Sequence, residues 1–61
     1  MRAKLKKILK LKRITHLDFV EIYITPKTGQ SYGNFMYMLG GFGNMDTKTA
    51  EIVQEYINDN S

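Results

Sequence analysis

The sequence predicts a small α+β domain: an antiparallel sheet of two or three strands, one C-terminal helix, and a basic N-terminal segment. Residues 19–25 are β-branched and aromatic, as strand residues often are. A second apolar stretch, residues 31–39, follows a turn that contains proline and glycine, which favours a hairpin. Residues 47–58 carry apolar side chains at helical spacing.

Length and composition allow one small domain without covalent cross-links. The chain has 61 residues, no cysteine and one histidine. That excludes disulfides, thiolate zinc sites and a cluster of imidazole ligands, so we expect no metal and no cofactor. A chain of this length buries only about 60% of the surface that its unfolded form exposes. We therefore expect a partner, which could be a second copy of the chain.

The charge is unevenly distributed. Residues 1–13 hold seven of the nine basic residues and none of the six acids, so this segment carries +7. Residues 14–61 hold two lysines and all six acids, which gives −4 and a net charge of +3 for the chain. We therefore divide the chain into a basic segment, 1–13, and one small acidic α+β domain, 14–61.

Three interpretations of the basic segment compete: it neutralises nucleic-acid phosphates, it lies on an anionic membrane, or it either is an ordinary solvated face or docks on the chain's own acidic surface. The membrane interpretation is disfavoured because the segment's leucines and isoleucines are spread around most of a helix. No apolar run approaches the roughly 20 residues needed to cross a bilayer. The local structure stays open between a helix over 2–8 that runs into a strand and an edge strand over 8–14.

The first strand is predicted over Phe19–Thr25, and Pro26–Gly29 supplies the turn, because proline fixes φ and glycine accepts a positive φ. The second strand is predicted over Ser31–Leu39, and Gly40–Asn44 ends it. The register depends on the length of the turn, because a shift of one residue moves one strand's side chains to the other face.

Both faces of this hairpin would carry large apolar side chains. We place the helix on the face with Val20, Ile22, Ile24 and Phe35. One helix covers one face of a small sheet. The other face is then either covered by the N-terminal segment or left open as a partner surface. Its side chains are Phe19, Tyr23, Tyr32, Met36 and Met38.

The C-terminal helix is predicted over Thr47–Asn58, with Asp46 as its N-cap. Its apolar face carries Ala50, Val53, Tyr56 and Ile57, and Ile52 broadens it. The acids Glu51, Glu55 and Asp59 recur every four residues and form one stripe on this helix. The stripe is either a solvated face or a surface that receives a basic partner.

No catalytic arrangement is evident, so we expect no enzyme activity and no small-molecule substrate. His16 is the only histidine, and no signature links it to an activated serine or threonine. The lysines interrupt the N-terminal segment so often that it holds no signal-peptide core. We expect a cytoplasmic protein.

The leading functional prediction is a binding module that contacts nucleic-acid backbone through its basic segment. Because most of the basic residues are lysines, we expect sequence-tolerant phosphate contact. The predicted nucleic-acid residues are Arg2, Lys4, Lys6, Lys7, Lys10, Lys12 and Arg13, with Tyr23, Tyr32 and Tyr37 as stacking candidates. The last two flank a stretch that partly resembles the aromatic strand of RNA-recognition modules, in which rings stack on bases.

The alternative is a protein-binding adaptor or inhibitor, with a homodimer as one form of it. It would use the exposed sheet face or the acidic stripe. The predicted interface residues are Phe19, Tyr23, Tyr32, Met36, Met38, Glu51 and Glu55.

Overall fold

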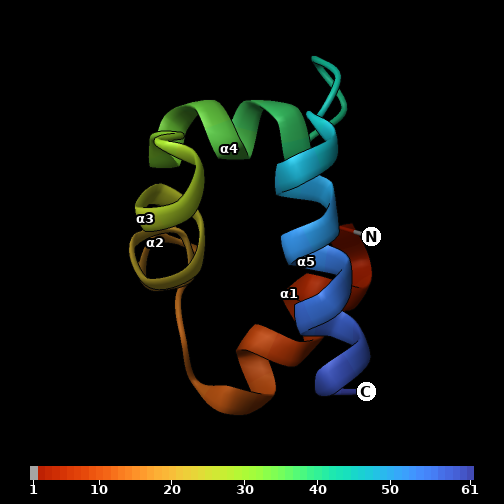
Figure 1. The fold of residues 1–61 in the computed structure, drawn as a ribbon. Helices are drawn as coiled ribbons and strands as arrows, with labels where there is room; N and C mark the ends of the chain where they lie inside the picture. The colour runs from red at the N-terminus through yellow and green to blue at the C-terminus, as the bar shows by residue number, and fades with distance from the viewer. Residues whose placement is uncertain (1) are drawn as a thin grey trace.

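The computed structural model describes residues 2–61 and is helical (Figure 1). Its elements are α1 (Arg2–Lys12), α2 (His16–Phe19), the π-helical turn η1 (Val20–Ile24), α3 (Thr25–Thr28), α4 (Tyr32–Leu39) and α5 (Thr47–Asp59). No strand occurs within residues 2–61, so the predicted α+β fold with its antiparallel sheet is wrong.

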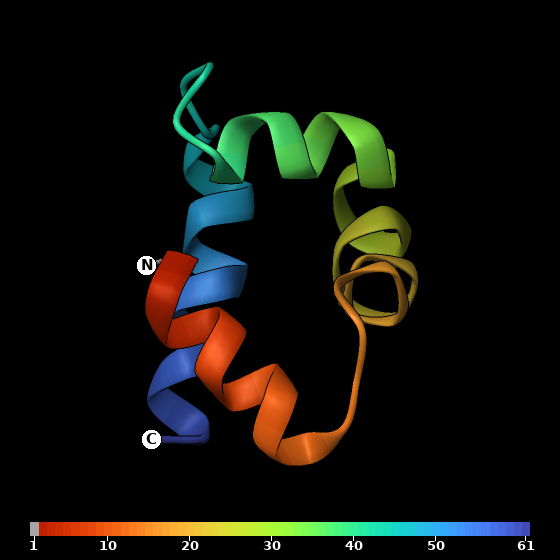
Figure 2. The ribbon, with the colours of Figure 1, turned by 180° about the vertical axis from the view of Figure 1, so that it is seen from behind.

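The elements form four helical segments, because α2, η1 and α3 follow one another without a break. In Figure 1, α4 crosses the top of the fold, the α2–α3 segment and α5 descend from its two ends, and α1 lies lower down. Figure 2, the view from behind, shows α1 beside α5, and these two helices are in contact. The α4 end and the α1 end of the molecule therefore lie apart.

The predicted first strand is helical because its apolar residues have helical spacing as well as strand propensity. Phe19, Val20 and Ile24 are fully buried, and Val20 and Ile24, four residues apart, share one face of a helix. Ile22 would share a strand face with Val20 and Ile24, yet it is 58% exposed. The proposed pairing of Val20, Ile22 and Ile24 with Phe35 on one sheet face is thus wrong.

Proline explains the wide turn η1. The backbone N–H of Thr25 donates to the Val20 carbonyl, five residues back, which is the π-helical pattern. Pro26 follows at once and has no N–H to continue an α-helical ladder. The chain accommodates Pro26 in the first turn of α3, where helices tolerate it.

The predicted turn Pro26–Gly29 is wrong except at its last residue, because residues 26–28 belong to α3 and the connection Gly29–Ser31 joins two helices. Gly29 has φ +76° and ends α3 in the left-handed conformation that glycine adopts without strain. Ser31 caps α4, because its hydroxyl accepts a hydrogen bond from the Asn34 backbone N–H at 3.1 Å. Phe35 and Leu39, four residues apart, bury the inner face of α4, so the predicted second strand is wrong as well.

The two ends of the chain are both helical. Residues 2–12 form one continuous helix, and Arg13 with φ +58° ends it. The helix predicted over 2–8 therefore continues to residue 12, and the strand that both alternatives placed after residue 8 is wrong. The C-terminal helix is confirmed over Thr47–Asp59 with Asp46 as its N-cap.

All four segments contribute to one core, so the predicted mismatch of a two-faced sheet with a single covering helix does not arise. Phe19 lies at the centre, with its ring 4.8 Å from that of Tyr56 and 6.0 Å from that of Phe35, measured between centroids. The buried hydrophobic residues are Leu5, Ile8, Leu9, Phe19, Val20, Ile24, Phe35, Leu39, Val53, Tyr56 and Ile57.

Candidate functional site

Helix α1 presents the basic residues to solvent. Leu5, Ile8 and Leu9 are its buried residues, and their spacing fixes which side of the helix faces the core. Lys6, Lys7 and Lys10 point away from that side, whereas Lys12, four residues after Ile8, lies on the same side but at the exposed end of the helix. All seven predicted phosphate contacts are exposed: Arg2, Lys4, Lys6, Lys7, Lys10, Lys12 and Arg13. They form the surface that we call the basic face.

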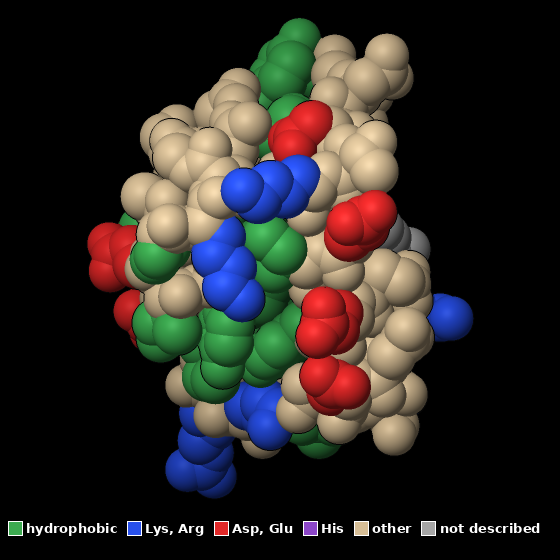
Figure 3. Space-filling view, viewed as in Figure 1, with side chains coloured by type: hydrophobic (Ala, Val, Ile, Leu, Met, Phe, Trp, Pro, Cys, Tyr) green, Lys and Arg blue, Asp and Glu red, His purple; other side chains and the backbone are tan. Residues whose placement is uncertain are grey.

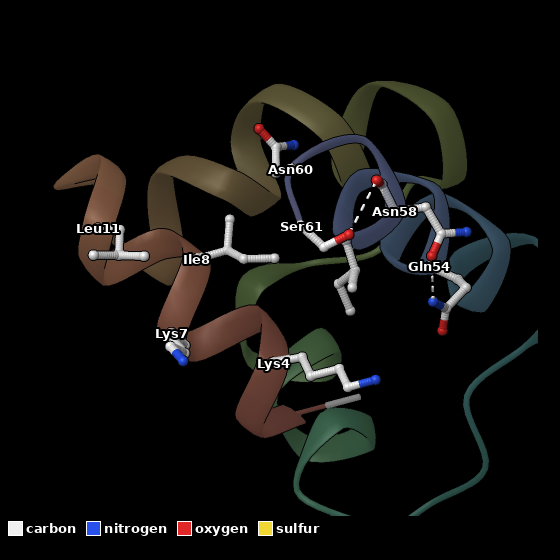
Figure 4. Close-up of a pocket in the computed structure, with 9 residues that line it drawn as sticks. Lys4, Lys7, Ile8, Leu11, Gln54, Asn58, Asn60 and Ser61 are labelled. Carbon is white, nitrogen blue, oxygen red and sulfur yellow. Dashed lines mark hydrogen bonds between the residues drawn. The ribbon is translucent and has the colours of Figure 1, made fainter.

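A groove of about 420 Å³ separates α1 from the end of α5, and Figure 4 shows its walls. Lys4 and Lys7 line its α1 side, and Ile8 and Ile57 are among its apolar residues. The α5 side offers amides, which are neutral. Its polar side chains are Gln54, Asn58, Asn60 and Ser61. Among the described residues that line the groove there is no Asp or Glu side chain.

The acids of α5 lie on another flank of that helix. Glu55 and Asp59 line a smaller hollow of about 130 Å³ together with Tyr23, Lys27 and Ile52. Figure 3 shows acidic side chains over α5, beside a hydrophobic area between α5 and the α2–α3 segment. Glu51, Glu55 and Asp59 are all exposed, as expected for a stripe on the helix surface. Most of the basic residues lie on α1, whereas Lys27 lies beside Glu55 and Asp59 at this hollow.

The positive charge of the basic face affects the pKa of His16. Partial burial lowers the pKa of its imidazole from the ordinary 6.5, and the positive charges of Lys6 and Arg2 lower it further. The charge of α1 therefore acts on a group at the start of α2.

The aromatic residues proposed for stacking do not form a platform with α1. Tyr23 is half-buried, with its ring centroid 5.3 Å from that of Phe19 and 5.0 Å from that of Tyr56. Tyr32 and Tyr37 are 42% and 55% exposed, but they lie on α4, at the other end of the fold. The structure therefore brings the predicted basic residues together and leaves the tyrosines away from them.

The predicted apolar interface is also not one surface. Phe19 has no exposed area, so it cannot contact a partner, because it sits in the core. Met36 and Met38 are half-buried on α4. Of this set, Tyr23 and Glu55 line the small hollow on the acidic flank of α5.

A helix–turn–helix arrangement is the feature that the sequence prediction missed. The helical segment ending at Thr28 is joined to α4 by the short connection Gly29–Ser31. A short turn of this kind, with its glycine, is typical of helix–turn–helix units. The signals present in the sequence were Gly29 as a helix terminator and Ser31 as an N-cap, followed by Phe35 and Leu39 four residues apart.

Within residues 2–61, no group of three or more acidic or histidine side chains is placed to hold a metal ion. Among these same residues, no helix has both the length and the apolar character that a bilayer crossing requires. No protein-family model, no curated protein and no solved structure matches this chain.

Proposed function

We propose that this chain is a nucleic-acid-binding module that contacts the sugar-phosphate backbone through the basic face of α1. The observation that carries the proposal is that all seven basic side chains of residues 2–13 are exposed, on a segment without acids. The groove beside them is lined by amide and hydroxyl side chains, with no Asp or Glu side chain among its described residues. A surface of this kind attracts a polyanion and releases its counterions on binding.

Contact of this kind is tolerant of sequence. Lysine is a compact point charge, and phosphates are the same at every base pair. The tyrosines are not available beside α1, so the proposal for this face is phosphate contact without base stacking.

The helix–turn–helix arrangement favours duplex DNA as the nucleic acid and offers a second surface. In such units, the second helix enters the major groove and its first residues reach the base edges. Here that helix is α4, which carries no charged residue. The only lysines outside α1, Lys27 and Lys48, lie on the helices that precede and follow it.

The alternative function, a protein-binding adaptor or a homodimer, is supported by the acidic flank alone. Glu55, Tyr23 and Ile52 surround its small hollow and offer both charge and apolar area. If the chain bound no nucleic acid, protein binding at this surface would become the favoured function.

Two matched double variants test the proposal. Lys6→Glu with Lys10→Glu changes the basic face, and Lys27→Glu with Lys48→Glu changes the lysines around α4. Each pair moves the net charge from +3 to −1, so the overall charge is the same in both. We expect the first pair to weaken binding to a duplex about 100-fold at 0.1 M salt, because about two phosphate contacts are lost. We expect the second pair to have a much smaller effect.

Binding is measured by fluorescence anisotropy over a range of salt concentrations. With about five phosphates engaged, the log–log slope for the wild type is expected to be roughly −4 to −5. If Lys27→Glu with Lys48→Glu weakened binding more than Lys6→Glu with Lys10→Glu, the phosphate contact would lie at the α4 end of the molecule and not on the basic face. A wild-type protein that binds neither duplex nor single strands would disprove the proposed function.

A further inference from the structure

We propose that Asn34, at the start of α4, recognises adenine in the major groove of duplex DNA, and that Gln30 and Asp46 orient it for this contact. The inference rests on the proposed nucleic-acid function, and it adds base recognition at a surface distinct from the basic face. It is carried by a relay of side-chain hydrogen bonds that joins the turn before α4 to the start of α5.

The relay begins at a carboxylate. Both oxygens of Asp46 accept hydrogen bonds from Thr49: Oδ2 from the backbone N–H at 3.1 Å and Oδ1 from the hydroxyl at 2.7 Å. These bonds lower the pKa of Asp46, so the group is ionised and can only accept. Its Oδ1 also accepts from Nε2 of Gln30 at 3.4 Å.

The carboxylate of Asp46 sets the orientation of the Gln30 side-chain amide, and Gln30 in turn sets that of Asn34. Because Gln30 directs its NH₂ group to Asp46, its carbonyl oxygen is left to accept from Asn34. Asn34 Nδ2 donates to that oxygen, which fixes the direction of the Asn34 amide. An amide carries two donor hydrogens and one acceptor oxygen. Among the hydrogen bonds of residues 2–61, none uses the second hydrogen or the oxygen of Asn34, and its side chain is exposed.

One donor beside one acceptor matches a single base in the major groove. Adenine presents the N7 acceptor next to the N6 amino donor, and the amide of asparagine pairs with both. Guanine presents two acceptors there, and cytosine and thymine each present one hydrogen-bonding group. The free edge of Asn34 therefore discriminates in favour of adenine.

The surroundings of Asn34 leave room for a duplex. The neighbouring Gly33 has no side chain, and nothing lies within 4 Å of where its Cβ would be. Tyr37, one turn further along α4, is 55% exposed and can flank the contact. An α-helix fits the major groove, and the first turn of the second helix is where such units meet base edges.

The test is selection from a pool of duplexes with a random central region. The protein is incubated with the pool at about 20 mM salt, where backbone contact is strong, and the retained duplexes are sequenced. We expect the wild type to enrich adenine at a fixed position by about ten- to a hundredfold over the other bases. Asn34→Ala is expected to remove this enrichment while the salt dependence of binding stays the same.

The chain offers a matched control. Gln54 and Asn58 form a second amide pair four residues apart on α5, with 3.0 Å between Nε2 of Gln54 and Oδ1 of Asn58. Asn58 also lines the groove beside the basic face, so Asn58→Ala is expected to leave the adenine preference intact even if it changes the affinity for the duplex. Asn34→Asp replaces the amide with an acceptor-only group, for which the cytosine amino group is the matching donor, so adenine enrichment should be lost. Circular dichroism verifies that each variant remains helical.

The outcomes separate the two proposals. Retention of duplexes without an adenine preference, or with one that survives in Asn34→Ala, would overturn the role of Asn34 and leave the basic face unaffected. A wild-type protein that retains no duplex and no single strand even at this salt would overturn the proposed function together with the inference.

Discussion

Helices α1 and α4 pack against the core in the same way but differ in the charge of their exposed surfaces. Both bury a stripe of apolar residues at helical spacing: Leu5 and Leu9 on α1, and Phe35 and Leu39 on α4. On the solvent side, α1 is crowded with lysines and arginine, whereas α4 carries no charge. The comparison shows that the buried stripe is enough to place a helix in this fold, and that the exposed positions are free to specialise.

The two surfaces differ in the range of the forces they exert. Charges on α1 act over about 10 Å at 0.1 M salt and do not depend on the sequence of the nucleic acid. Hydrogen bonds from α4 act only at contact, and they depend on which groups meet. If one molecule of DNA engages both helices, the basic face supplies affinity and α4 supplies preference.

The largest expected effect tests the shared packing rule. Phe35→Ala should cost about 3–5 kcal/mol of unfolding free energy, and Leu9→Ala about 2–5 kcal/mol, because each leaves a cavity in the core. A chain of this size has only about 3–9 kcal/mol in total, so both variants should be largely unfolded in mild urea. Urea denaturation followed by circular dichroism measures this.

Exposed residues on the same helices provide the controls. Tyr37→Ala and Leu11→Ala remove side chains that are 55% and 77% exposed, so each should change stability by less than about 0.5 kcal/mol. If Phe35→Ala were as stable as Tyr37→Ala, the packing of α4 described here would be wrong.

A smaller effect concerns how α4 begins. Ser31→Ala removes the hydroxyl that accepts from the Asn34 backbone N–H, so it should cost about 1 kcal/mol. Ser61→Ala is the matched control, because its hydroxyl only donates to the Asn58 carbonyl at the end of α5. The thermal midpoints of the two variants give the comparison. Equal midpoints would argue that Ser31 does not cap α4.

The smallest effect uses His16 as a reporter of the basic face. Its pKa is lowered by burial and then by Lys6 and Arg2, so Lys6→Gln should raise it, and Lys48→Gln should leave it unchanged. A duplex bound at α1 should also raise it, because phosphates oppose the positive charge. A duplex bound only at α4 should not. NMR titration of the single imidazole measures all three cases.

The same shift has a consequence for stability. Because the folded state holds the pKa of His16 below its unfolded value of 6.5, protonation favours the unfolded chain. His16 therefore contributes nothing to the free energy of unfolding well above pH 6.5, and it lowers this free energy as the pH falls through that value. In Lys6→Gln, this acid-dependent loss should be smaller than in the wild type.

Several features could be predicted from local sequence because they depend on neighbours along the chain. The C-terminal helix follows from its cap at Asp46 and its apolar spacing, both of which act within a few residues. The turn at Gly29 follows from the conformational freedom of glycine. The charge division between residues 1–13 and 14–61 is a property of the sequence itself.

The errors fall where local preference and tertiary packing disagree. Residues 19–25 and 31–39 have strand-like composition, but β-propensity reflects packing on a pleated surface and is easily overridden. Phe19, Ile24 and Phe35 fit one helical core together with α1 and α5, and burial of that core exceeds the local preference. Phe19, one of the proposed interface residues, is buried for the same reason, since it lies at the centre of that core.

The amino-acid sequence fixes the C-terminal helix, the glycine turn and the concentration of charge on one segment, because these depend on residues close together in the chain. Tertiary structure alone decides that the middle of the chain is helical, that Lys4 and Lys7 share a groove with the amides of Gln54 and Asn58, and that Gln30, Asn34 and Asp46 form one relay. These features depend on contacts between distant residues, and such contacts exist only once the core has brought the helices together.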